Sequence, residues 1–217
     1  FHERDKRWAC IVAHRRAGKT VACIADLVLA ALQSKRRGAR YAYISPHYNQ
    51  SKDIAWNYVR QYAATGHFNE SELRVDFPNG NRVRLYGADN YDRMRGIGLD
   101  GVVCDEFADM DPRAWTEVIR PALSDRGDGW AVFIGTPKGH NTFYEIAQRA
   151  AADDEWFSLT LKASDTGILP ESELKAAQTD MPADQYQQEY ECSFEAAVQG
   201  SYFSNEFQQI DENEQIT

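Results

Sequence analysis

The chain has 217 residues, of which 43% are hydrophobic and 26% are charged. This length corresponds to a single domain, and the apolar content is enough to build a sizeable core. The longest nearly apolar run, 21–32, contains Asp26 and is shorter than the roughly 20 residues that cross a bilayer, and the charged N-terminus is not typical of a secretory signal. We therefore expect a cytosolic protein without a membrane segment, in which the four cysteines are buried, reduced thiols.

Charge is distributed unevenly along the chain. The net charge is −9, but residues 1–100 contain 17 Lys and Arg against 10 Asp and Glu, whereas residues 101–217 contain 7 against 23. An acidic total therefore does not exclude a basic face. The densest basic cluster, 35–37 with Arg40, fits either a solvated helix end or a contact with DNA.

Short apolar runs alternate with helical segments. Buried strands are predicted at 8–13, 41–45, 101–105, 130–135 and 156–161, and helices at about 19–33, 49–63, 112–120, 141–151, 171–179 and 183–191. Two alternating segments, 73–77 and 82–86, flank the turn 78–81 and predict a β-hairpin. This order predicts an α/β fold in which helices cover both faces of a mainly parallel sheet and a hairpin is added.

The segment 13–20, which has the sequence AHRRAGKT, lies between the first strand and the first helix. It matches the phosphate loop GxxxxGK[ST] except that Ala13 replaces the first glycine. Backbone N–H groups around Gly18 can hold phosphate oxygens, Lys19 can reach the β- and γ-phosphates, and the Thr20 hydroxyl can bind Mg²⁺. A chance Gly-Lys-Thr in a basic turn is the alternative, and the strand–loop–helix context favours the phosphate loop.

A second motif ends the strand at 101–105. Asp105 can hold Mg²⁺ through its water shell, and Glu106 can polarise the attacking water. Two acids also fit an ordinary strand end. A carboxylate beside the metal-side acid nevertheless favours a hydrolysing ATPase over small-molecule kinases and over GTPases that use glutamine.

The next strand ends in the motif 134–139, where Thr136 can contact the γ-phosphate and sense hydrolysis. Taken alone, this motif is also typical of a Gly/Pro turn. Arginines complete the pattern, because a guanidinium matches the charge of a transferring phosphoryl group. Arg15 and Arg16 lie inside the phosphate loop, and Arg95 precedes the acidic strand. Each of the three also fits an ordinary surface arginine.

Taken in order, these motifs resemble the large terminase subunit, the DNA-packaging motor of tailed bacteriophages, in its N-terminal ATPase domain. The resemblance rests on arginines before Gly-Lys-Thr, an Arg-Gly before the acidic strand, the acidic strand 103–108, the motif 135–144 and the hinge-like segment 200–203. It covers about 8–203, and it implies a P-loop NTPase of the RecA/ASCE-like type that uses ATP and Mg²⁺.

The resemblance also implies roles for individual residues. It assigns nucleotide binding to Arg16, Ala17, Gly18, Lys19 and Thr20. It assigns Mg²⁺ binding to Thr20 and Asp105, and catalysis to Glu106, Arg15 and Arg95. Thr136 belongs to the motif that couples hydrolysis to DNA movement. Arg15 acts within its own chain in this scheme, and Arg95 is offered to a neighbouring subunit.

The family further implies partners and boundaries. Residues 1–199 are expected to form the ATPase domain and 200–217 a hinge or linker toward an absent nuclease domain, so nuclease activity is not expected. Expected partners are double-stranded DNA, the small terminase subunit, the portal protein of the procapsid and further copies in a ring, with an isolated monomer in the cytoplasm of the infected host. The family's adenine-contacting glutamine has no counterpart before Trp8. The alternatives are one motor domain of a DNA helicase and a non-hydrolysing nucleotide switch, and Glu106 argues against the switch.

Overall fold

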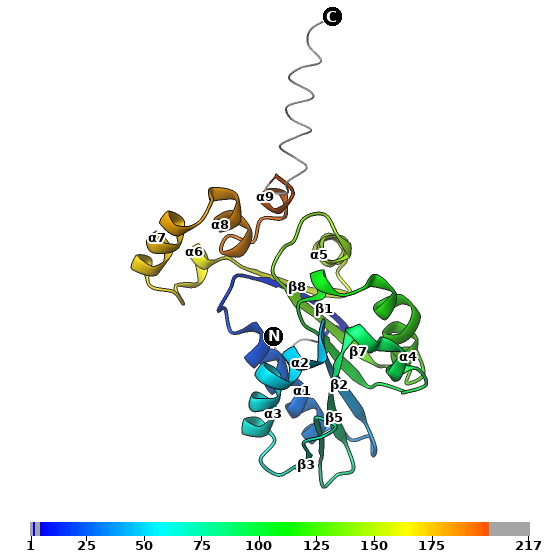
Figure 1. Ribbon diagram of the computed structural model, residues 1–217. Coiled ribbons are helices and arrows are strands. Elements are labelled where there is room, and N and C mark those ends of the chain that lie inside the picture. Colours follow the sequence, from blue (N-terminus) through cyan, green and yellow to red (C-terminus); the bar gives the residue numbers. More distant parts are fainter. Residues whose placement is uncertain (1, 3–4, 200–217) are drawn as a thin grey trace, which may run out of the picture.

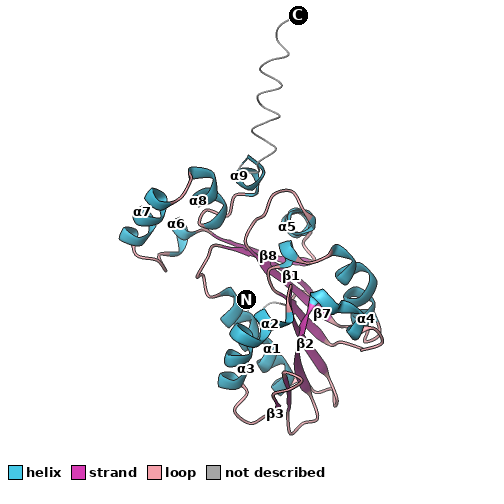
Figure 2. Cartoon of the chain, in the orientation of Figure 1, coloured by secondary structure: helices cyan, strands magenta, loops and turns pink. Residues whose placement is uncertain are grey.

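The computed structural model describes residues 2 and 5–199. These residues form an eight-stranded sheet of order β3-β4-β5-β2-β6-β7-β1-β8 (Figure 2). The strands are β1 Trp8–Ala13, β2 Arg40–Ser45, β3 His67–Asn69, β4 Arg74–Asp76, β5 Arg82–Gly87, β6 Gly101–Cys104, β7 Trp130–Gly135 and β8 Trp156–Leu161. Neighbouring strands are parallel along the part of the sheet with the order β5-β2-β6-β7-β1-β8. At the other end of the sheet, β3 pairs with β4 and β4 pairs with β5 in antiparallel orientation.

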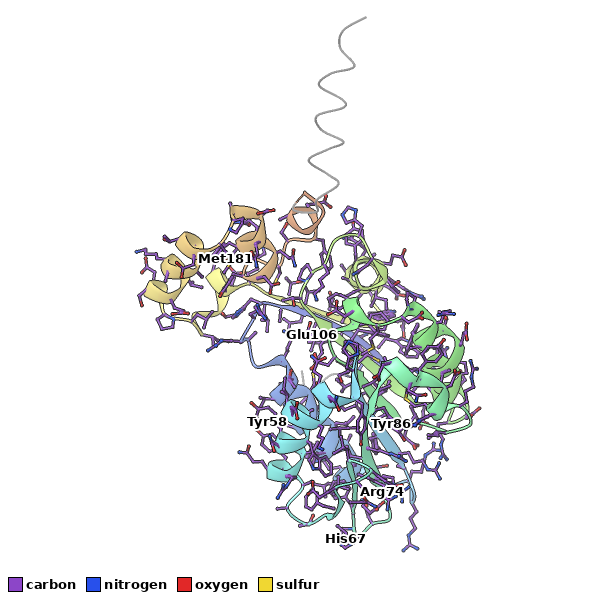
Figure 3. All side chains as sticks on the ribbon, viewed as in Figure 1. Tyr58, His67, Arg74, Tyr86, Glu106 and Met181 are labelled. Atoms are coloured by element: carbon purple, nitrogen blue, oxygen red, sulfur yellow. The ribbon has the colours of Figure 1, made fainter. Side chains whose placement is uncertain are left out.

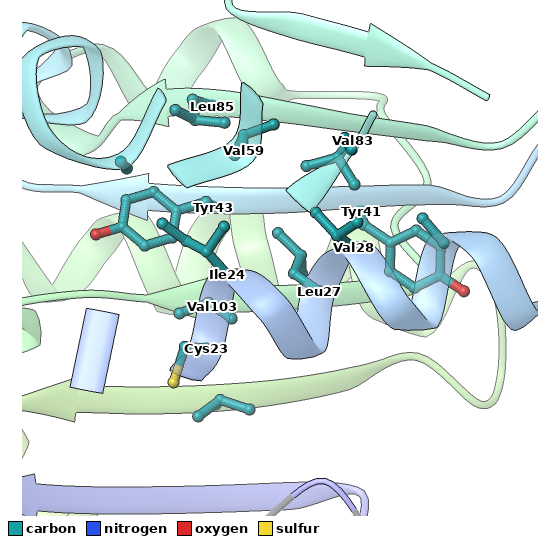
Figure 4. Close-up of a cluster of buried hydrophobic side chains, with 14 of the residues drawn as sticks. Cys23, Ile24, Leu27, Val28, Tyr41, Tyr43, Val59, Val83, Leu85 and Val103 are labelled. Atoms are coloured by element: carbon teal, nitrogen blue, oxygen red, sulfur yellow. The ribbon is translucent and has the colours of Figure 1, made fainter. Parts of the chain in front are cut away.

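Helices cover both faces of this sheet. Successive side chains of a strand point to opposite faces, and in β1 Ile11 and Val12 accordingly belong to different cores. On one face Ile11 joins the core under α1 (Lys19–Gln33) and α3 (Trp56–Tyr62), which Figure 4 shows around Leu27 and Val103. On the other face Val12 joins the core under α4 (Arg120–Ser124) and α5 (Thr142–Ala152). Burial of both faces explains why the strands are continuous apolar runs.

Short helical segments complete the described chain. They are α2 Tyr48–Gln50, α6 Ala163–Thr166, α7 Glu171–Asp180, α8 Ala183–Glu189 and α9 Phe194–Gln199, with π-helical turns at Ser51–Ala55 and Ala114–Ile119 and 3₁₀ turns at Ala88–Met94 and Phe107–Asp109. Figure 1 shows α6, α7 and α8 grouped beyond the β8 edge of the sheet. The phosphate loop, drawn in blue, extends toward this group.

The predicted α/β fold with a mainly parallel sheet, two helical layers and an added hairpin is confirmed. Several details differ from the sequence prediction. The helices predicted at 49–63 and 112–120 each contain a π-helical turn, and the second continues to Ser124. The strand β3 and the short helices α6 and α9 were not predicted. The boundary after residue 199 stays a prediction, because the segment 200–217 lies outside the described residues.

Two further expectations concern buried and basic side chains. All four cysteines are buried thiols, and burial raises the pKa of Cys10 to about 12. In the basic cluster at the end of α1, the Arg36 guanidinium lies 3.1 Å from Asp100 and 2.9 Å from Asp128. Arg36 therefore braces the chain where α1 leads into β2, and these ion pairs occupy it within the fold.

Candidate nucleotide-binding site

The three predicted motifs meet at one edge of the sheet. The phosphate loop follows β1, Asp105 and Glu106 follow β6, and Thr136 follows β7. Because β7 lies between β1 and β6 and all three strands are parallel, their carboxyl ends lie side by side. This is the edge at which open α/β sheets bind ligands.

The phosphate loop has a backbone suited to an anion. Arg16 and Gly18 both have positive φ angles, 64° and 76°, and Ala17 N donates to His14 O at 3.3 Å. A left-handed conformation at a non-glycine residue such as Arg16 costs about 1 kcal/mol or more. Gly18 caps α1 without a side-chain hydrogen bond, so the first N–H groups of the helix remain available to phosphate oxygens.

Asp105 is the most constrained carboxylate of the site. Its Oδ2 accepts hydrogen bonds from Thr20 Oγ1 at 3.0 Å and from the Tyr43 hydroxyl, and its Oδ1 accepts from the Glu106 N–H at 2.8 Å. Burial raises the pKa of Asp105, the charge of Glu106 raises it further, and Tyr43, Lys19 and Thr20 lower it. The Tyr43 contact was not predicted, because a tyrosine within a buried strand has the signature of an ordinary core residue.

Thr20 and Asp105 supply the hard oxygen atoms that Mg²⁺ prefers. No group of three or more His, Cys, Asp and Glu side chains within the described part of the chain is arranged to hold a metal. Mg²⁺ at this position would therefore depend on nucleotide phosphates and water as well as on protein oxygens, which is its usual mode of binding. The two residues fit that mode.

Glu106 lies between the other two motifs. Its Oε1 is 3.4 Å from Lys19 Nζ, and its Oε2 is 3.5 Å from Thr136 Oγ1. Glu106 lies just past the end of β6 and has a positive φ of 47°, a backbone conformation that is strained in a residue other than glycine. Figure 3 shows Glu106 at the centre of the molecule, where the sheet edge faces the phosphate loop. The predicted residues Lys19, Glu106 and Thr136 are thus brought together.

A polar cavity of about 450 Å³ surrounds this cluster. The predicted residues that line it are Arg15, Arg16, Lys19, Glu106 and Thr136. Sequence reasoning did not identify four more lining residues, which are Gln50, Asp109, Lys138 and Glu189. Lys138 follows Thr136 in its motif and binds Asp109 at 2.6 Å, so its place after Pro137 was the one available signal.

The phosphate loop is also held from the C-terminal side. Arg15 N donates to Glu189 O at 3.0 Å, and Arg15 Nε lies 3.5 Å from Glu189 Oε2. His14 N donates to Leu161 O at 3.0 Å, and the His14 ring lies 3.0 Å from the Thr166 hydroxyl. These bonds join the loop to β8, α6 and α8, and no sequence motif predicted them.

Arg95 does not line the cavity of its own chain. Its Nε donates to Asp92 at 2.7 Å and its Nη2 donates to Glu117 at 3.1 Å, and its side chain is 53% exposed. Both partners are themselves exposed, so these bonds give Arg95 a bracing role on the surface. Its role toward a neighbouring subunit stays a prediction.

Comparison with known proteins identifies relatives of this chain. The family model "Terminase large subunit, T4likevirus-type, N-terminal" matches residues 10–209. The large terminase subunit of Thermus virus P23-45 is 34% identical over 163 residues, which cover 65% of this chain and 33% of that protein. The large terminase subunit of Escherichia phage T5 is 26% identical over 212 residues, which cover 94% of this chain and 46% of that protein. The chain thus spans between a third and a half of the length of these relatives.

Solved structures share the fold. The large terminase ATPase domain of Thermus phage P74-26 has a TM-score of 0.77 at 24% identity and covers 89% of this chain and 90% of its own. The large terminase of a thermophilic bacteriophage, solved in complex with ADP, has a TM-score of 0.74 at 17% identity and covers 88% of this chain and 49% of its own. The predicted P-loop fold is therefore confirmed. In the described part of the chain, no helix is long and apolar enough to cross a membrane. The chain belongs to the terminase large-subunit family and corresponds to its N-terminal domain.

Proposed function

We propose that this domain binds ATP with Mg²⁺ and hydrolyses it to move double-stranded DNA into a procapsid. The observation that carries the proposal is the convergence of Lys19, Glu106 and Thr136 on one polar cavity, beside the Thr20–Asp105 pair. The large terminase of the thermophilic bacteriophage has been solved both with ADP and with ATP-γ-S, so this fold accommodates a nucleotide in that protein.

The ion pair between Lys19 and Glu106 defines the resting state of the site. Lys19 is 9% exposed and Glu106 is 24% exposed, so the two charges are partly desolvated and satisfy each other. The phosphates of an incoming nucleotide compete for Lys19, because they carry more negative charge than one carboxylate. Binding therefore releases Glu106 to accept a proton from the attacking water.

The remaining residues orient the reaction. Thr20 and Asp105 would hold Mg²⁺, which when bound neutralises charge on the phosphate oxygens. Thr136, which contacts Glu106 at 3.5 Å, senses whether that carboxylate is paired or free and can transmit the change to β7. Arg15, at the mouth of the cavity, is available to the transferred phosphoryl group from within the same chain, as we infer from its place in the lining.

The contact between Glu106 and the phosphate-loop lysine favours hydrolysis over a non-hydrolysing switch, because it puts a candidate base within the cavity that would hold the γ-phosphate. We also propose that the domain acts in a ring of identical subunits with DNA, the small terminase subunit and the portal protein, in the cytoplasm of an infected bacterium. The direct test is release of phosphate from Mg²⁺–ATP by the purified chain, with and without duplex DNA and the small subunit. Absence of phosphate release under every one of these conditions would overturn the proposal.

A further inference from the structure

Strand β5 carries a row of polar side chains on the face opposite α1. Val83 and Leu85 are buried in the core under α1 and α3, and Arg82, Arg84 and Tyr86 alternate with them. Because alternate side chains of a strand share a face, these three lie together on the other face of the sheet. Figure 3 labels Tyr86 of β5 and Arg74 of the neighbouring strand β4.

A small cavity of about 90 Å³ opens on this face. Three arginines from two adjacent strands line it, Arg40 of β2 and Arg82 and Arg84 of β5, together with Tyr41, Tyr86 and the apolar Ile97 and Leu99. No acidic residue is among its lining. The cavity is therefore a cationic pocket with an apolar wall, of a size that suits one small anionic group and excludes a nucleotide.

The charges in this pocket are incompletely satisfied. Arg84 Nε is buried and has no hydrogen-bond partner, and the Arg84 guanidinium lies over the Tyr86 ring at 5.1 Å from its centre. Within the described part of the chain, Arg82 pairs with Asp76 at 2.5 Å, whereas neither Arg40 nor Arg84 forms a side-chain ion pair. Burial raises the pKa of Tyr86, and Arg84, Arg40 and Arg82 each lower it, as expected of three positive charges near one hydroxyl. An unmade bond at a buried guanidinium is costly, and an anion in the pocket would relieve it.

We propose that Arg40, Arg82 and Arg84 form a binding site for a backbone phosphate of duplex DNA. This inference rests on the proposed packaging function. Guanidinium groups match phosphate oxygens in charge and in geometry, and phosphate contacts provide most of the sequence-independent affinity for DNA. A motor that moves DNA of any sequence requires contacts of that kind.

A polymer suits the pocket better than a free anion does. A second cavity of about 350 Å³ shares Arg84 and Tyr86 with the first and is also lined by Arg93, together with the acidic Glu72 and Asp89. Positive side chains thus come from β2 (Arg40), from β5 (Arg84) and from the 3₁₀ turn that follows β5 (Arg93), and the two acids line the second cavity only. A single phosphate would contact one of these two cavities, whereas consecutive backbone phosphates of DNA can contact both.

The test is duplex DNA binding by the full chain, measured by fluorescence anisotropy over a series of salt concentrations. Each lost phosphate contact lowers the slope of log affinity against log salt by about 0.9. We expect Arg84→Ala to lower the slope by about that amount and to weaken binding about tenfold at the lowest salt, as for loss of a charged hydrogen bond. Arg84→Lys keeps the charge and is expected to retain the slope, which separates loss of the contact from loss of packing on Tyr86.

The matched control is Arg113→Ala, which removes an equally charged arginine that is 66% exposed and bound to Asp111. Slopes of Arg84→Ala and Arg113→Ala that are equal would overturn the proposal. So would protection of the wild-type chain from thermal unfolding by inorganic phosphate that matches protection by DNA at equal phosphate concentration, because the occupant would then be a free anion. Self-association at low salt that Arg84→Ala abolishes would identify a second copy as the occupant and would also overturn it.

Phosphate release by the same variants separates this inference from the proposed function. If the wild-type chain releases phosphate from ATP and the salt slopes of the Arg84 and Arg113 variants are equal, the DNA site fails and the ATPase stands. If the slope differs as expected and no condition gives ATP turnover, the ATPase fails and the DNA site stands.

Discussion

The substitution Glu106→Gln separates nucleotide binding from chemistry. It retains the shape of the side chain and removes the charge that lies 3.4 Å from Lys19 Nζ and 3.5 Å from Thr136 Oγ1. Loss of a general base lowers turnover by about 10² to 10⁴-fold. The resting ion pair with Lys19 is lost at the same time, and a partly exposed pair of this kind contributes about 1 kcal/mol or less. ATP affinity is therefore expected to stay equal or to rise by up to about fivefold, because Lys19 no longer has to leave a partner.

The assay is phosphate release in a single turnover, run beside equilibrium binding of a fluorescent ATP analogue. Glu173→Gln, an equal charge change on the exposed side of α7, serves as the control and is expected to change neither measurement. If affinity and turnover of Glu106→Gln fall together by similar factors, Glu106 acts in building the site and the assignment of the base is wrong. A turnover within about threefold of the wild-type rate would also refute the assignment, because a threefold loss is far smaller than the loss expected when a general base is removed.

Three further predictions concern the same site. Lys19→Ala is expected to abolish nucleotide binding while the circular dichroism spectrum stays that of the wild type, and unchanged turnover would contradict the phosphate-loop assignment. Arg95→Ala chains mixed with Glu106→Gln chains are expected to recover part of the wild-type turnover, since a site with an intact Glu106 and a neighbour's intact Arg95 can form, and the gain in an arginine-dependent site is about 10³ to 10⁵-fold. Failure of the mixture under conditions where wild type assembles would remove the trans role from Arg95. Finally, the pKa of Asp105 is raised above its ordinary 3.8. As pH rises, Asp105 ionises at a lower pH in the unfolded chain than in the folded chain. It therefore lowers the free energy of unfolding from about pH 4 up through its raised pKa. Without Mg²⁺, the melting temperature of Asp105→Asn relative to wild type is expected to rise over that window, and a pH-independent difference would contradict the linkage.

Much of the fold was predictable because the signals are local. The runs at β1 and β7 are short, apolar and followed by turn residues, so their bounds were predicted without error. The phosphate loop and the acidic pair are contiguous motifs with defined chemistry. Strand order is a different kind of information. That β7 lies between β1 and β6, and so brings Thr136 to Glu106, depends on pairing between distant segments that no local pattern encodes.

Contacts that cross the sequence were not predictable for the same reason. Glu189 meets Arg15 from a helix far along the chain, and its own segment has no motif that marks it. Tyr43 lies among apolar residues whose pattern indicates only burial, so its bond to Asp105 was hidden. The π-helical turn at Ser51–Ala55 has helical composition and differs only in how the backbone bonds pair. Arg95 is the opposite case, because its motif is visible in the sequence whereas its side chain binds the exposed Asp92 and Glu117 in this chain.

The strand order has a mechanical consequence. Because β1, β7 and β6 are hydrogen-bonded neighbours, Lys19, Thr136 and Glu106 stand on one stiff frame, and side-chain rearrangement there can shift them by little. Larger displacements therefore have to arise in elements that lie outside this frame. The group α6–α8 lies outside this frame and contacts the phosphate loop through Arg15, which binds Glu189, and through His14, which binds Thr166. We expect a change in the phosphate loop to displace these helices while the sheet stays in place.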